Sequence, residues 1–187
     1  AKRFSKKRDL TDKTMIALIE SISSLVLRGP VRDEEIALYR GISTSVASAG
    51  GDFDEAVAYV VKTMVQSPRF LYQVEEPARG SQPRRVNAFE LASRLSFALW
   101  GSAPDEELLR VAQNRSLHQK SVRRSQIQRM LEDPRARKRS LDFCSEWLHL
   151  ERLSYLQPNQ DHFPDWDPSL AISMQEETLR YFEEVVW

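Results

Sequence analysis

The segment 161–167 holds the densest set of oxygen and nitrogen donors in the chain. Carboxylates gathered in one loop can bind Ca²⁺, so Asp161, His162 and Asp165 are weak candidate metal ligands. Their spacing does not match an EF-hand loop, and no glycine provides the sharp turn that such a loop needs. The alternative is structural, with Asp167 capping a helix and the aromatic side chains packing. We favour this alternative and expect no metal site.

Arg94 is the second residue whose type and position could carry chemistry. It lies between Leu91 and Leu95 in a strongly apolar segment, and a buried arginine needs a carboxylate partner. We expect a structural ion pair with a glutamate of the last helix, with Glu177 as the best candidate. The functional alternative is an arginine that binds an anion in a cleft. A cleft that gathered Arg94, Glu90 and Glu177 would favour an enzyme.

Complete catalytic and cofactor motifs are missing from the sequence. The single cysteine, Cys144, lies on an apolar face and predicts a buried, inert thiol. No G-x-S-x-G turn or glycine-rich phosphate loop is present, and without Cys-x-x-Cys-His this chain attaches no c-type haem. We therefore assign no catalytic residue and expect no cofactor in this chain, and whether it is an enzyme stays open.

The formal net charge of +0, from 27 basic and 27 acidic residues, hides a strong asymmetry. Residues 110–139 carry ten basic side chains against two acidic ones, whereas residues 159–187 carry seven acidic side chains against one basic. The basic window could dock an acidic protein or haem propionates, or it could be an ordinary solvated face. Without interleaved aromatic residues it predicts no nucleic-acid binding. The possible docking face consists of Arg123, Arg124, Arg129, Arg135, Arg137, Lys138 and Arg139.

The apolar residues recur at helical spacing along almost the whole chain and predict an all-α fold. We expect about eight helices in an irregular bundle of two subdomains packed together. The subdomains would span 1–75 and 87–187, joined by a linker at 76–86 that is rich in proline and glycine. No run of about 18 apolar residues suggests a membrane span. The last helical pattern has no stop signal, so we expect a C-terminally truncated piece of a longer protein.

Three local features of these helices can be checked directly. Gly29 is expected to end the first helix in the left-handed conformation. Asp52 with Glu55, and Asn87 with Glu90, match the capping box. The helix after Pro134 is expected to bury Leu141, Cys144, Trp147 and Leu148.

Several segments together resemble a family of uncharacterised domains. The resemblance covers roughly residues 25–187 and is to the tandem helical domains of unknown function found in planctomycete-type, c-type-cytochrome-associated multidomain proteins. The segments that carry it are Leu27–Glu35, Ser67–Tyr72, Glu90–Leu108, Met130–Ala136 and Phe143–Leu148.

The resemblance implies an exported, periplasmic or cell-surface parent protein, with haem c held by other domains. The partners would then be neighbouring domains of that protein, including a cytochrome domain. The favoured function is a helical scaffold or interaction module. One alternative is part of an enzyme whose active site is completed by other domains, and another is a cation-stabilised binding module that uses the 161–167 loop. No catalytic residue is carried over from the family.

Overall fold

The computed structural model describes residues 12–75 and 83–187. These residues contain no strand and include eight helices of eight or more residues, which confirms the all-α prediction. The helices are α1 (Asp12–Val26), α2 (Asp33–Ser48), α3 (Phe53–Val65), α4 (Pro68–Leu71), α5 (Ala88–Trp100), α6 (Glu106–Gln113), α7 (Lys120–Glu132), α8 (Pro134–Leu148) and α9 (Pro168–Val186), with short 3₁₀ helices η1 (Ser116–His118) and η2 (Leu150–Tyr155).

The chain forms two compact units, and each is described by itself. Unit 1 comprises Ala1–Ser96 with Ala103–Arg123, and unit 2 comprises Phe97–Ser102 with Arg124–Trp187. Most of the predicted linker, at residues 76–82, lies outside the described residues. The predicted division into 1–75 and 87–187 therefore stays a prediction.

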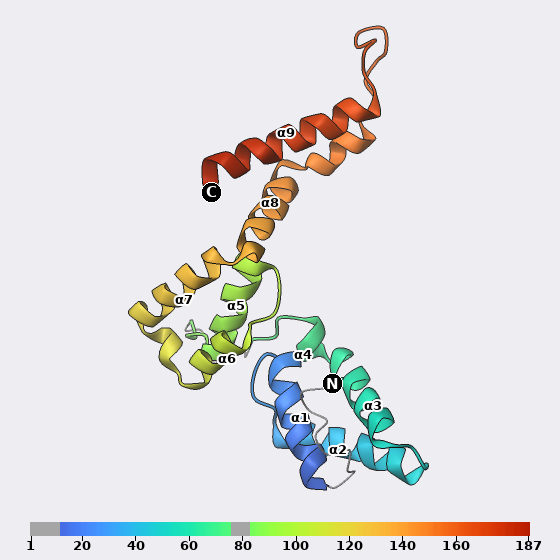
Figure 1. Cartoon of the computed structure of the whole chain (residues 1–187), viewed down its shortest axis with the longest axis vertical. Helices are drawn as coiled ribbons and strands as arrows, with labels where there is room; N and C mark the ends of the chain where they lie inside the picture. The colour runs from blue at the N-terminus through green and yellow to red at the C-terminus, as the bar shows by residue number, and fades with distance from the viewer. Residues whose placement is uncertain (1–11, 76–82) are drawn as a thin grey trace. The chain divides into compact units, whose positions relative to one another are not determined.

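The main core of unit 1 forms where α1, α2 and α3 pack against one another (Figure 1). Apolar residues of α1 and α3 face this core, because residues at three- and four-residue steps share one side of a helix. Each fully buried large apolar side chain contributes about 1.5–3 kcal/mol relative to exposure. The core residues are Met15, Leu18, Ile19, Leu27, Tyr39, Phe53, Ala56, Val60 and Met64.

Both predicted capping boxes are present. The Asp52 side chain accepts from the Glu55 amide at 2.9 Å, and the Glu55 carboxylate accepts from the Asp52 amide at 3.1 Å. Asn87 and Glu90 exchange the equivalent bonds at 2.9 and 2.6 Å. Asp167 caps α9 by accepting from the amides of residues 169 and 170, as the structural alternative predicted. These bonds satisfy amides that the first helical turn leaves without partners.

The first helix ends differently from the prediction. Arg28, with φ 58°, occupies the left-handed region, and Gly29 does not. A non-glycine residue there is strained, and the side-chain bonds of Arg28 described below compensate for the strain. A Cβ at Gly29 would lie 3.4 Å from the Phe89 ring, which is an ordinary van der Waals contact.

Substitution by alanine should have opposite effects on the free energy of unfolding at Gly51 and at Gly41. A Cβ at Gly51 would come within 2.5 Å of the Val46 side chain and 3.0 Å of the Val46 carbonyl oxygen, whereas Gly41 has nothing within 4 Å. We expect Gly51→Ala to lower the free energy of unfolding by about 1–3 kcal/mol. Gly41→Ala in the exposed middle of α2 should raise it by about 0.5–1 kcal/mol. Urea unfolding measures both, and shifts of the same sign would contradict this account.

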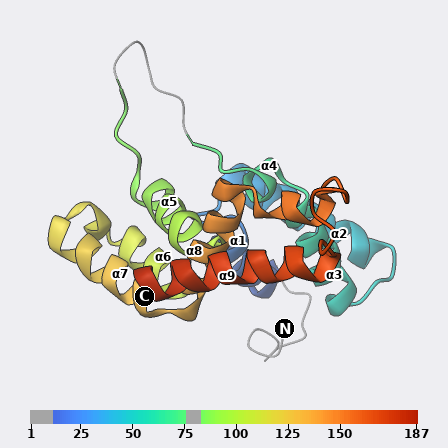
Figure 2. The same cartoon turned by 90° about the horizontal axis from the view of Figure 1, so that it is seen from above.

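Unit 2 is built around α8, η2 and α9, and it buries few large side chains. Figure 1 shows α9 returning beside η2 and α8, and Figure 2 shows the same helices from above. Only Ala136, Cys144, Leu150 and Ala171 of this helical group are buried. The covered strip of α8 is narrow because α9 and η2 provide most of the packing against this helix.

This narrow strip overturns part of the prediction for the helix after Pro134. Cys144 is buried as predicted, at 1% exposure, but Trp147 is 65% exposed and Leu148 is 47% exposed. Apolar spacing identifies a helix face that could be buried, whereas burial itself depends on how many neighbours cover that face.

Candidate functional site

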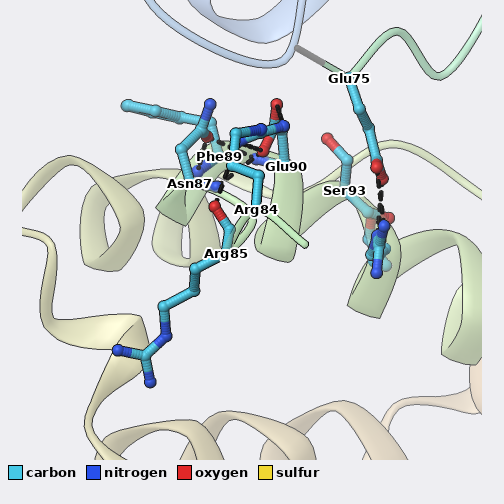
Figure 3. A network of polar contacts seen from close by, with 9 residues as sticks. Glu75, Arg84, Arg85, Asn87, Phe89, Glu90 and Ser93 are labelled. Atoms are coloured by element: carbon cyan, nitrogen blue, oxygen red, sulfur yellow. Dashed lines mark hydrogen bonds and ion pairs between the residues drawn. The ribbon is translucent and has the colours of Figure 1, made fainter. Parts of the chain in front are cut away.

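Charged side chains meet at the start of α5, next to the capping box of that helix. Glu90 is buried and accepts two hydrogen bonds from the Arg84 guanidinium at 2.9 and 2.8 Å. It also accepts the Asn87 amide hydrogen bond, so one carboxylate serves both an ion pair and a helix cap. Figure 3 shows Arg84, Asn87 and Glu90 in this group, with Glu75 nearby.

Arg94 pairs with Glu75 and not with the predicted Glu177. Its guanidinium donates two bonds of 2.6 Å to the Glu75 carboxylate, and its side chain is 55% exposed. The side-chain bonds from Arg94 lower the pKa of Glu75. The prediction of a buried arginine is therefore wrong.

Helix geometry explains the error at Arg94. Apart from Glu90, which is paired with Arg84 at the helix start, the buried residues of α5 are Ala88, Ala92, Ser96 and Trp100. Arg94 lies two residues from Ala92, which is about 200° around the helix. The neighbouring leucines are only half-buried, so their apolar character does not identify the side of α5 that is buried.

A cavity of about 400 Å³ in unit 1 adjoins this network. Its walls come from residues 27–32 and 73–75, from Arg69, and from the start of α5. The two carboxylates on its wall, Glu75 and Glu90, are each engaged by an arginine. Because the contact with Arg94 lowers the pKa of Glu75, that carboxylate is a weak base near neutral pH. Glu177 belongs to unit 2, so a site that gathers it with Arg94 and Glu90 stays a prediction.

Two arginines on the other wall of the cavity connect segments that lie far apart in the sequence. Arg28 donates to the carbonyls of Arg69, Phe70 and Tyr72, the last two at 3.0 and 2.7 Å. Burial, and then the charge of Arg69, lower the pKa of Arg28. Arg69 in turn donates to the carbonyls of Leu27 and Pro30 at 3.4 and 3.2 Å.

Glu35, on α2, adds an ion pair with Arg69 to these contacts. Its carboxylate accepts from the Arg69 guanidinium at 2.6 Å, from the Arg32 amide at 2.9 Å and from the Arg32 guanidinium at 3.2 Å. Burial raises the pKa of Glu35, but the bonds from Arg32 and Arg69 outweigh it and hold the pKa at about 2. Sequence reasoning missed this group, and the available signal was Arg69 in segment 67–72 together with the charged residues of segment 27–35.

Trp100 is the centre of a comparable group in unit 2. Its ring is 5% exposed, and its Nε1–H donates to the Met130 carbonyl at 2.9 Å. The Arg135 guanidinium lies 3.6 Å from the ring centroid, and that of Arg129 lies 5.5 Å away. Asp133 anchors Arg135 at 2.7 Å. Cation–π contacts and one hydrogen bond thus connect the end of α5 to α7 and α8.

The basic window is partly engaged inside the molecule and does not form one free face. Beyond Arg129 and Arg135, Arg137 pairs with Glu183 at 2.5 Å, and Arg139 lies 3.4 Å from Glu146. Within the described part of the chain, neither Arg124 nor Lys138 has an ion pair, and both are exposed.

Arg123 differs from the rest of the window in its location. Its side chain donates to the His118 carbonyl at 3.2 Å. It belongs to unit 1, whereas the other six basic residues belong to unit 2.

The candidate metal ligands lie on the loop before α9. Asp161, His162 and Asp165 are all exposed. Across residues 12–75 and 83–187, no three His, Cys, Asp or Glu side chains come together as a metal ion would need. In the same residues, no helix is both long and apolar enough to cross a membrane.

Unit 2 instead exposes many large apolar side chains on α8, η2, α9 and the loop between them. The Phe143 and Trp147 rings stack with centroids 5.9 Å apart and planes 18° apart, and both remain largely exposed. The exposed set comprises Phe143, Trp147, Leu148, Tyr155, Leu156, Phe163, Leu170, Ile172, Met174, Tyr181, Val185, Val186 and Trp187. We call it the exposed apolar set of unit 2.

Comparison with known families accounts for both halves of the chain. Residues 86–187, more than half of the chain, match PSD4, described as a protein of unknown function (DUF1592). The chain belongs to the DUF1592 family. Residues 15–75 match PSD5, a protein of unknown function (DUF1595). Neither a curated protein nor a solved structure matches the chain.

The family matches coincide with the two contact groups. The DUF1592 segment contains the Trp100 group and the exposed apolar set of unit 2. The DUF1595 segment contains the contacts of Arg28, Arg69 and Glu35. Both family descriptions leave the function open, so no residue role is transferred to this chain.

Proposed function

We propose that this DUF1592 protein is a helical interaction module that positions neighbouring domains of a longer, exported, c-type-cytochrome-associated protein. Its partner in this proposal is a cytochrome domain of the same protein, and haem c belongs to that partner. The family resemblance described above supports the cytochrome association and the extracytoplasmic location. The exposed apolar set of unit 2 supports the interaction role.

The exposed apolar set of unit 2 is the observation that carries the proposal. Isolated exposed apolar residues are common on soluble proteins, but a concentration of large ones marks an interaction surface. Here the α8–η2–α9 group buries four apolar residues and exposes many more, with Trp147 at 65% and Tyr155 at 83%. Tryptophan and tyrosine are also the residues that most often dominate binding energy at protein interfaces.

The basic window offers weaker support for binding than the exposed aromatic residues do. Arg129 and Arg135 contact Trp100, and Arg137 and Arg139 form ion pairs within the chain. A partner would have to compete with these contacts. We therefore assign the docking role to the apolar residues and a secondary, salt-dependent role to Arg124 and Lys138.

A binding measurement with the purified cytochrome domain tests the proposal. We expect the double variant Phe143→Ser/Trp147→Ser to weaken binding at least about tenfold, because interface aromatic residues carry much of the binding energy. Tyr59→Ser is the matched control, since Tyr59 is a 52% exposed aromatic residue of unit 1. Calorimetric titration measures all three proteins.

Charge reversal at exposed positions provides the contrasting arm. Arg124→Glu/Lys138→Glu should weaken binding only about two- to threefold, and mainly at low salt. A large loss of affinity in this variant, together with unchanged binding of the Phe143→Ser/Trp147→Ser protein, would favour the basic residues as the docking surface instead. Absence of binding by the unaltered chain would overturn the proposed function.

A further inference from the structure

Helix α9 has one face packed in unit 2 and one that is exposed. Ala171 on the packed side is 4% exposed, whereas Leu170, Met174, Tyr181 and Val185 are 42%, 39%, 74% and 68% exposed. These four residues are spaced by four, seven and four positions, so they lie along one side of the helix. We call them the α9 stripe.

Two carboxylates border the α9 stripe on the side away from the packed face. Glu177 and Glu184 are seven residues apart, are both exposed, and lie next to the stripe by helix geometry. Within residues 12–75 and 83–187, neither forms an ion pair. The other α9 glutamates do, since Glu176 lies 3.6 Å from Arg180 and Glu183 pairs with Arg137.

We propose that the α9 stripe docks a protein surface with an apolar centre bordered by lysine or arginine side chains. The stripe supplies the apolar centre, which drives association, and Glu177 and Glu184 select a cationic border on the partner. This inference rests on the proposed interaction role and names the chemistry of the partner surface.

The charge pattern favours this partner over a second copy of the chain. A second α9 would bring another pair of carboxylates to the same border, and like charges in an interface are unfavourable. The only basic residue of α9, Arg180, is engaged by Glu176. A symmetric pair of α9 helices would therefore lack the cations that the border requires.

Two synthetic helical peptides test the inference. Both carry the same leucine stripe, bordered by lysine in one peptide and by glutamate in the other. Fluorescence anisotropy at low salt should show at least about tenfold tighter binding of the lysine peptide. The variant Glu177→Lys/Glu184→Lys should reverse this preference, and circular dichroism checks that it keeps its helix content.

A second pair of variants compares the stripe with an exposed aromatic residue outside it. Tyr181→Ser should weaken binding of the lysine peptide at least about tenfold. Tyr59→Ser should leave it unchanged, because Tyr59 is 52% exposed and belongs to unit 1, outside the stripe. Equal binding of the two peptides, or equal effects of these two variants, would overturn the inference.

Two further outcomes have defined meanings. A concentration-dependent dimer in sedimentation that Tyr181→Ser abolishes would overturn the inference in favour of a second copy. If the cytochrome domain still binds but the peptides are not discriminated, the inference fails and the proposed function survives.

Discussion

Trp100→Ala is expected to lower the free energy of unfolding by about 3–5 kcal/mol. The substitution removes a ring that is 5% exposed and leaves a cavity where α5 meets α7 and α8. It also removes the hydrogen bond to the Met130 carbonyl and the surface on which Arg135 lies. Urea unfolding followed by far-ultraviolet circular dichroism measures the loss.

Trp147→Ala is the matched control for Trp100. Both tryptophans belong to unit 2, but Trp147 is 65% exposed, so its substitution should change stability by only about 0.5 kcal/mol. Trp100→Phe keeps most of the ring and removes the donor, and it should fall between the two. Similar losses for Trp100→Ala and Trp147→Ala would contradict the central role of Trp100.

The second large effect is a pH dependence of stability that originates at Glu35. Its pKa is about 2 in the folded protein and about 4.5 without these contacts. Because the folded pKa is depressed, the stabilisation is fully present above about pH 5 and is lost as the pH falls toward 2. For this mostly buried side chain, 14% exposed, the contribution is about 3 kcal/mol.

Glu35→Gln isolates this contribution. The difference in unfolding free energy between the unaltered chain and the variant should be constant from pH 7 to about pH 5, and it should shrink steadily below that. Glu34→Gln is the control, since Glu34 is exposed on the same turn of α2. A Glu35→Gln difference that does not change between pH 7 and pH 3 would rule out this linkage.

The helices and the main core were predictable because their signals are local. Ile19 and Val60 recur with their neighbours at helical spacing, and both are buried as that spacing predicts. The capping boxes at Asp52 and Asn87 need only a three-residue pattern. In each case the residues that determine the structure lie within one or two turns of one another.

The ion pairs and the exposed surface depend on contacts that the local pattern does not encode. Arg28 reaches Tyr72 across 44 positions, and Arg137 reaches Glu183 across 46. The local pattern does not identify Glu75 as the partner of Arg94, because the helix face of Arg94 and the path of the preceding segment follow from the whole fold. The exposure of Trp147 has the same origin, since few elements cover α8.

The burial of the single cysteine makes its labelling rate a measure of local opening. Cys144 is the one thiol in 187 residues and is 1% exposed on α8, the helix against which η2 and α9 pack. A thiol reagent reaches it only when this part of unit 2 opens. Its labelling rate therefore reports the opening of the region that contains the α9 stripe, without any engineered residue. A partner seated on that stripe would slow the labelling, so the native thiol can reveal occupancy as well as opening.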